Sequence, residues 1–100
     1  MYHNTLGVAE FRLGNYQEAI EAAKISTEKT PKEFNLPSAH PADLAILAMS
    51  HHKLGEDAKA QEFHEQVNTS MEFEAFKSDP ECISFSTEVN QLLGSPAIKN

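Results

Sequence analysis

Apolar residues along this chain recur at the three- and four-residue spacing that amphipathic helices show. Leu6, Ala9 and Leu13 follow this spacing near the N-terminus. A second set follows it in the middle of the chain, at Leu44, Leu47, Met49, Ser50 and Leu54. The whole pattern predicts five helices, at about residues 2–13, 16–29, 41–53, 56–76 and 80–93. We expect the fourth helix to break near residues 68–70. We therefore expect an all-α fold.

Glycine and proline residues mark where these helices end. Gly14 and Gly55 follow the first and third helices, and glycine adopts the left-handed conformation of a helix C-cap at little cost. Proline removes a backbone donor and disfavours helix before it. Pro31 therefore predicts that the second helix stops before a loop at Thr30–Ala39. Pro41 suits the first turn of the helix that follows.

The C-terminal part opens with a strong helix start. Asp79 suits the N-cap position and Pro80 the first turn. The apolar residues that follow lie mostly on one face of a helix, at Ile83, Phe85, Val89, Leu92 and Leu93. Gly94 then ends the helix. We expect this helix, about residues 79–93, to cap the preceding ones, and residues 95–100 to form a frayed tail.

The sequence also repeats itself. A shift of 41 residues places Leu6 on Leu47, the Leu-Gly pair at 13–14 on the pair at 54–55, and Ala19 on Ala60. Small residues such as the two alanines let a pair of helices approach closely. The short connections after the glycines make neighbouring helices antiparallel. The repeat therefore predicts two antiparallel helix hairpins.

The same residues resemble a tetratricopeptide repeat (TPR), whose pattern is W-x2-L-G-x2-Y, then A-x3-F, then P. Leu6-Gly7, Ala19 and Pro31 stand at the matching spacings, and the segment 14–20 is similar to the turn between the two helices of the family. In the second copy the matching residues are Leu44, Leu47, Ala48, Gly55 and Ala60. The aromatic positions differ, with His3, Glu10, His51, Ala23 and His64 in their places.

The resemblance implies a right-handed helical solenoid. It would consist of two TPR-like hairpins, at about residues 2–30 and 41–70, plus the C-terminal capping helix, within one domain of residues 1–94. The first helix of each repeat would line a concave groove, where members of the family mostly bind peptides or partner helices. Carried over by position, the peptide-binding residues would be Asn4, Val8, Phe11, Arg12, Ala45, Met49, His52 and Lys53.

Two pairs of these groove residues indicate the kind of partner. Arg12 and Lys53 occupy equivalent repeat positions, so side by side they could hold an acidic side chain or a terminal carboxylate. The alternative is that both are solvated charges favoured by the helix dipole. Phe11 and Met49 could contact an apolar side chain of the partner. Their alternative role is burial against a neighbouring helix.

Charge and composition narrow the partners. The chain has a net charge of −7, which gives it no electrostatic reason to approach nucleic acid or an anionic membrane. No apolar run approaches the roughly 20 residues that a membrane span requires, and the N-terminus lacks the pattern of a secretory signal. The single cysteine, Cys82, can form no internal disulfide. We therefore expect a cytoplasmic protein.

Patterns of catalysis and metal binding are missing from the sequence. The four glycines are scattered rather than gathered in a phosphate loop, and no nucleophile stands beside a base. His51 and His52 are adjacent, so on a helix they point about 100° apart and do not easily share a metal ion. We expect no enzyme, no cofactor and no metal.

The sequence therefore predicts a protein–protein interaction scaffold that binds a peptide or partner helix in the concave groove. The alternative is an assembly or oligomerisation element, or a fragment of a larger multi-domain TPR protein, because two repeats are few for a stable array. A homodimer would then form through the N-terminal helical face, which includes Tyr2, Leu6 and Tyr16.

Overall fold

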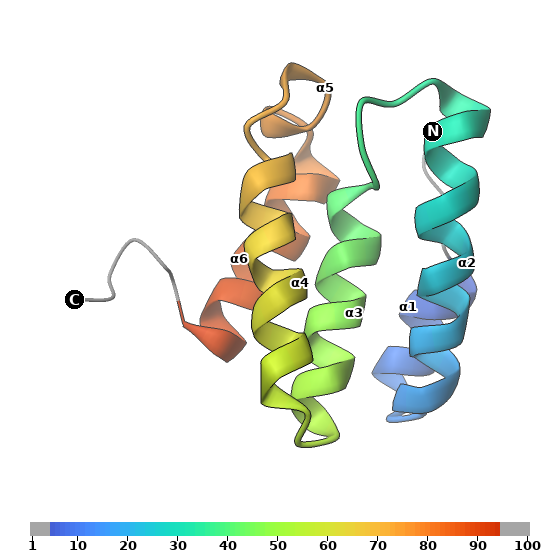
Figure 1. Cartoon of the computed structure of the whole chain (residues 1–100), viewed down its shortest axis with the longest axis vertical. Helices are drawn as coiled ribbons and strands as arrows, with labels where there is room; N and C mark the ends of the chain where they lie inside the picture. The colour runs from blue at the N-terminus through green and yellow to red at the C-terminus, as the bar shows by residue number, and fades with distance from the viewer. Residues whose placement is uncertain (1–4, 95–100) are drawn as a thin grey trace.

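Six helices make up most of residues 5–94, the part of the chain that the computed structural model describes (Figure 1). They are α1 (Thr5–Arg12), α2 (Tyr16–Phe34), α3 (Pro41–Lys53), α4 (Asp57–Ser70), α5 (Glu74–Lys77) and α6 (Pro80–Leu93). No strand occurs between residues 5 and 94. The prediction of an all-α fold is confirmed, whereas the expected tail at residues 95–100 lies outside the described residues.

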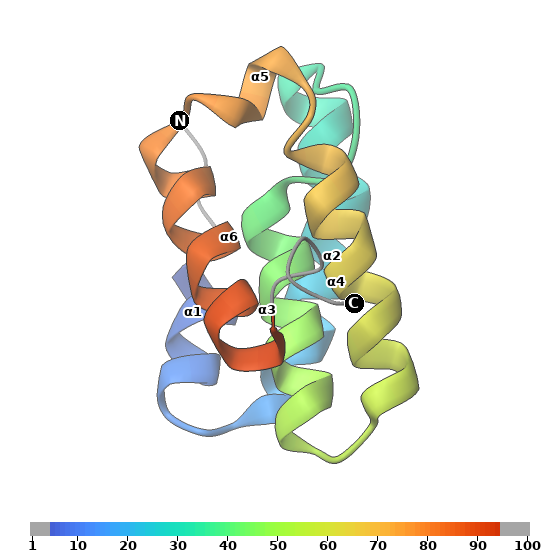
Figure 2. The ribbon, with the colours of Figure 1, turned by 90° about the vertical axis from the view of Figure 1, so that its left-hand side faces the viewer.

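The helices form two layers, and α3 contacts helices of both. Figure 1 shows α2, α3 and α4 side by side, with α1 and α6 behind them. Figure 2, turned by 90°, shows α1 and α6 on the same side of α3. α3 packs against α2 and α4 within its own layer and against α6 and α1 in the other. The solenoid arrangement that the TPR resemblance implies stays a prediction.

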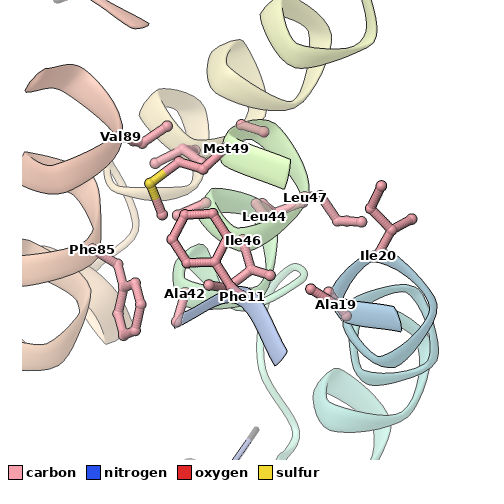
Figure 3. Close-up of a cluster of buried hydrophobic side chains, with 14 residues drawn as sticks. Phe11, Ala19, Ile20, Ala42, Leu44, Ile46, Leu47, Met49, Phe85 and Val89 are labelled. Carbon is pink, nitrogen blue, oxygen red and sulfur yellow. The ribbon is translucent and has the colours of Figure 1, made fainter. Parts of the chain in front are cut away.

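α3 has no face toward solvent over most of its length. Every residue from Pro41 to His51 is buried, and a helix that is apolar almost all round is stable only when it is covered on every side. Ala19 and Ile20 of α2 lie against one side of α3 (Figure 3). Phe85 and Val89 of α6 lie against the other side. The hydrophobic core is therefore centred on α3.

Local capping signals set the helix ends that the sequence predicted correctly. Asp79 accepts hydrogen bonds on Oδ1 from the backbone N–H groups of Glu81 and Cys82, at 2.8 and 3.4 Å, so α6 begins where expected. Gly14 and Gly55 have φ angles of 84° and 80°. This left-handed conformation ends α1 and α3.

The second helix is longer than the sequence predicted. α2 continues through Pro31 to Phe34, so the expectation of a loop from Thr30 is wrong. Proline costs a helix the hydrogen bond to the carbonyl four residues back, but this one missing bond does not end α2, and three more helical residues follow Pro31. α2 ends instead at Asn35, whose φ of 54° is left-handed and whose N–H donates to the Pro31 carbonyl.

The fourth helix breaks close to the expected place. α4 ends at Ser70, a short turn follows, and helix resumes at Glu74 in α5. Phe76 of α5 is buried, and its ring meets the ring of His40 edge-on with 5.3 Å between the centroids. α5 therefore covers the end of the core beside the start of α3.

Hydrogen bonds between buried polar groups fix how the helices sit on one another. Ser26 of α2 donates from Oγ to Oδ2 of Asp43, at 2.6 Å, and Asp43 is fully buried in the first turn of α3. His64 of α4 donates from Nε2 to Oδ1 of Asn90 in α6, at 2.7 Å. Asp43 and His64 are buried, and a hydrogen bond to a group from which water is excluded is strengthened by the low local dielectric. These two bonds hold α3 on α2 and α6 on α4.

Candidate docking site

A surface pocket of about 420 Å³ lies where α1, α2, α3 and α6 meet, and we call it the α1–α6 pocket. Its walls are formed by Phe11, Arg12, Tyr16, Met49, Lys53, Glu88, Gln91 and Leu92. The volume falls in the range of roughly 300–1,000 Å³ that is typical of ligand sites. Apolar side chains next to charged ones make this pocket a candidate docking site.

The two basic residues of the pocket come from helix ends. Arg12 is the last residue of α1 and Lys53 the last residue of α3. A cation at the C-terminus of a helix is favoured by the helix dipole. The left-handed glycines just after them turn the chain away at the same end of the molecule. Both cations therefore line one pocket, as their equivalent repeat positions led us to expect.

The apolar wall of the pocket is fixed by packing. The rings of Phe11 and Tyr16 are tilted by 57° with 5.7 Å between their centroids, and the guanidinium of Arg12 lies 5.5 Å from the centre of the Phe11 ring. Phe11 is only 8% exposed and Met49 is fully buried. These two residues are thus core residues whose edges reach the pocket. Of the two roles that the sequence left open, burial against a neighbouring helix is the one observed.

Arg12 is held by an ion pair across the pocket. Its Nη1 and Nη2 atoms each donate to a different carboxylate oxygen of Glu88 in α6, the second bond measuring 2.8 Å. This hydrogen bonding lowers the pKa of Glu88 and raises the pKa of Arg12, and partial burial opposes both shifts. The pair joins residues 76 positions apart in the chain. It closes α6 onto α1.

Four of the predicted groove residues line the α1–α6 pocket, namely Phe11, Arg12, Met49 and Lys53. The others do not. Ala45 is fully buried, so its expected place on an open groove is wrong, because neighbouring helices enclose α3 on every side at this position. Val8 is half-buried against the core, and Asn4 lies outside the described residues. His52 lines a neighbouring pocket of about 280 Å³, 3.7 Å from Asp57.

Sequence reasoning missed the part of the pocket that α6 contributes. Glu88, Gln91 and Leu92 form one wall, and the sequence predicted their helix without indicating where it docks. A signal was present, because Phe85 and Val89 give α6 an apolar face that must be buried somewhere. The pattern alone did not say that α3 would receive this face.

A buried cysteine–histidine pair lies outside the pocket and is neutral. His40 accepts the backbone N–H of Ala42 on Nδ1, so its Nε2 carries the proton that points at Cys82 Sγ, 3.6 Å away. Burial lowers the pKa of His40 to about 4 and raises the pKa of Cys82 to about 12. A protonated thiol is a poor nucleophile. The pair therefore packs beside the start of α3, where His40 caps the helix.

A second cavity, of about 360 Å³, lies between α4 and the segment before α3. Glu62 and Glu65 stand at its rim, and Leu44 and Phe73 contribute apolar surface. Within residues 5–94 no group of three potential metal ligands comes together. None of the helices described is both long and apolar enough to cross a bilayer.

Comparisons with known proteins give no relative: no family model, no curated protein and no solved structure matches the chain. The TPR resemblance therefore rests on the residues that carry it.

Proposed function

We propose that this chain is a protein-interaction module that docks a peptide or partner helix in the α1–α6 pocket. The observation that carries the proposal is the composition of that pocket. The fixed apolar wall of Phe11, Tyr16 and Leu92 stands beside Lys53, an exposed cation with no ion pair among the described residues. Apolar surface with one or two orienting charges is what a docking site for a partner side chain requires.

The rest of the chain supports binding over catalysis. The one buried thiol is protonated beside a neutral imidazole, whereas nucleophilic catalysis needs an activated group next to a base. The TPR resemblance points to the same class of function. We further propose a short TPR-like unit whose groove is covered by its own helix α6. A cytoplasmic location is part of the proposal, because the single cysteine is a buried free thiol.

The test is a peptide selection followed by a charge reversal. Peptides selected against the wild-type chain by phage display are measured by fluorescence anisotropy against wild type, Lys53→Glu and Lys59→Glu. Lys59 is an exposed residue of α4 that lines none of the three pockets described above. Both variants change the net charge equally, so the comparison isolates position.

We expect the selected peptide to bind Lys53→Glu at least about tenfold more weakly than wild type, as loss of a charged hydrogen-bond donor costs about 1.5–3 kcal/mol. Lys59→Glu should bind like wild type. Both variants should stay folded, because the substituted residues are exposed and the interaction of Lys53 with the dipole of α3 is worth only about 0.3–1 kcal/mol. Equal affinity for all three proteins would place the site elsewhere. A selection that enriches no peptide would count against docking altogether.

A second candidate function, self-assembly through α1, has an observation of its own. Leu6 is 63% exposed and Leu13 is 75% exposed, and Ala9 lies between them on the same side of the helix. This stripe faces away from the rest of the molecule, since Gly7 and Phe11 on the opposite side of α1 are buried. Of the other two predicted members of the face, Tyr2 lies outside the described residues, and Tyr16 lines the α1–α6 pocket instead.

Analytical ultracentrifugation of wild type and the Leu6→Ser/Leu13→Ser variant tests this second function. A dimer that becomes monomeric in the variant would support assembly through α1. A wild-type chain that stays monomeric across the accessible concentration range would exclude it.

A further inference from the structure

We infer that the group recognised in the α1–α6 pocket is a carboxylate, and that Glu88 of the chain itself occupies its place in the unbound protein. The inference rests on the proposed docking function and adds the chemistry of the ligand and the step that admits it. A partner would present a carboxylate next to an apolar group. Its carboxylate would replace Glu88 on Arg12.

The geometry of the ion pair is the first support. Arg12 uses two nitrogens, Nη1 and Nη2, and each donates to a different oxygen of Glu88. This fork-to-fork arrangement is the preferred way in which a guanidinium binds any carboxylate. Packing against Phe11, 5.5 Å from the ring centre, orients the guanidinium. A carboxylate site thus already exists at the wall of the pocket and holds an internal carboxylate.

The balance of charge is the second support. Two cations, Arg12 and Lys53, line the pocket against a single carboxylate, Glu88. No ion pair reaches Lys53 from residues 5–94, although the chain as a whole carries a net charge of −7. An incoming carboxylate therefore meets an excess of positive charge among the residues that line the pocket.

Competition with Glu88 explains why the ligand needs an apolar part. An internal group acts at an effective concentration of roughly millimolar, so a free carboxylate competes poorly on charge alone. An apolar group that fills the space beside Phe11, Met49 and Leu92 adds the burial that Glu88 cannot supply. The ligand is therefore a carboxylate with an adjoining apolar side chain, as a partner protein presents at an acidic residue or at its C-terminus.

The exchange needs no unfolding of α6. Phe85 and Val89 remain buried against α3 without Glu88, and the hydrogen bond from His64 to Asn90 still joins α4 to α6. Glu88 and Arg12 are also partly exposed, with 33% and 51% of their side-chain surfaces open to water. Displacement is thus a side-chain rotation at the surface, after which α6 loses its tie to α1.

A pair of small probes that differ only in charge tests the inference. 4-Phenylbutyrate carries an apolar ring and a carboxylate, and 4-phenylbutanamide is its neutral counterpart. Each is titrated into the full-length nitrogen-15-labelled chain, and amide chemical shifts report both the affinity and the place of binding. The proteins are wild type, Glu88→Gln, Glu88→Asp, which keeps the charge on a shorter side chain, and Glu28→Gln. Glu28 is an exposed residue of α2 that lines none of the described pockets.

We expect 4-phenylbutyrate to shift amides around Arg12 and Lys53 and to bind Glu88→Gln about tenfold more tightly than wild type, since a charged competitor is removed. Glu88→Asp should fall between the two, Glu28→Gln should match wild type, and the amide should bind every protein equally weakly. Equal affinities of acid and amide, with shifts confined to the pocket, would overturn the inference and leave the docking function standing. The inference would also be overturned if neither compound shifted the amides of the pocket in any of the four proteins. The docking function would then be tested by the peptide selection alone.

Discussion

Ser50 offers a test in which a substitution should stabilise the protein. Its side chain is fully buried in α3, and its Oγ has no hydrogen-bond partner among the described residues. Burying a hydroxyl without a partner costs about 1–3 kcal/mol in proteins. Alanine is also the better helix former, by about 0.5 kcal/mol. The small void left by one oxygen offsets part of this gain, because each lost atomic contact is worth about 0.1–0.2 kcal/mol.

We therefore expect Ser50→Ala to raise the free energy of unfolding by about 1–2 kcal/mol. Ser70 supplies the matched control, because it is 2% exposed at the end of α4 and donates from Oγ to the Val67 carbonyl at 2.8 Å. Ser70→Ala should lower the free energy by about 0.5–1.5 kcal/mol. Urea denaturation followed by circular dichroism measures both. If Ser50→Ala destabilises the chain as much as Ser70→Ala does, the unpaired hydroxyl is not a cost and the reasoning fails.

Two further predictions concern α6 and the start of α3. Phe85→Ala should lower the free energy of unfolding by about 3–5 kcal/mol, because this ring fills the space between α6 and α3. Ile83 lies on the exposed side of α6 and supplies the control. In the same urea titration, Ile83→Ala should change the free energy of unfolding by about 0.5 kcal/mol or less. The pKa of His40 is lowered to about 4 by burial, below its unfolded value near 6.5, so the unfolded chain binds the proton first as pH falls. The contribution of His40 to stability should be fully present above pH 6.5 and decline between pH 6.5 and pH 4. His40→Asn keeps a cap acceptor and should make that decline shallower. An unchanged pH profile of stability in this variant would contradict the role of His40.

The helix bounds that sequence predicted well are those set by local chemistry. Asp79 and Pro80 start α6 and Gly55 ends α3 through interactions within a few residues, so their signals can be read from the chain alone. Pro31 misled because its effect depends on where in a helix it stands. The left-handed Asn35 a few residues later is what ends α2. Asparagine adopts that conformation less often than glycine, which makes it a weaker sequence signal.

The part of the site that escaped prediction depends on packing between distant segments. The spacing of Leu6, Ala9 and Leu13 correctly predicted a helix, yet two of these residues are the most exposed large apolar residues described in the chain. α1 is apolar on both sides, so periodicity could not say which side faces the core. In the same way, the apolar face of α6 did not indicate which helix it packs against. The repeat did place Arg12 and Lys53 together, but the pairing of Glu88 with Arg12 could be seen only in the fold.

The enclosure of α3 has a consequence for how the protein comes apart. A helix buried from Pro41 to His51 has no stable existence before its neighbours arrive, because its surface is almost wholly apolar. The hairpin of α1 and α2 on one side and helices α4 and α6 on the other therefore all pack against α3. Neither half can melt while the other stays intact. The chain should gain and lose its structure as one cooperative unit, and loosening the last helix weakens the first.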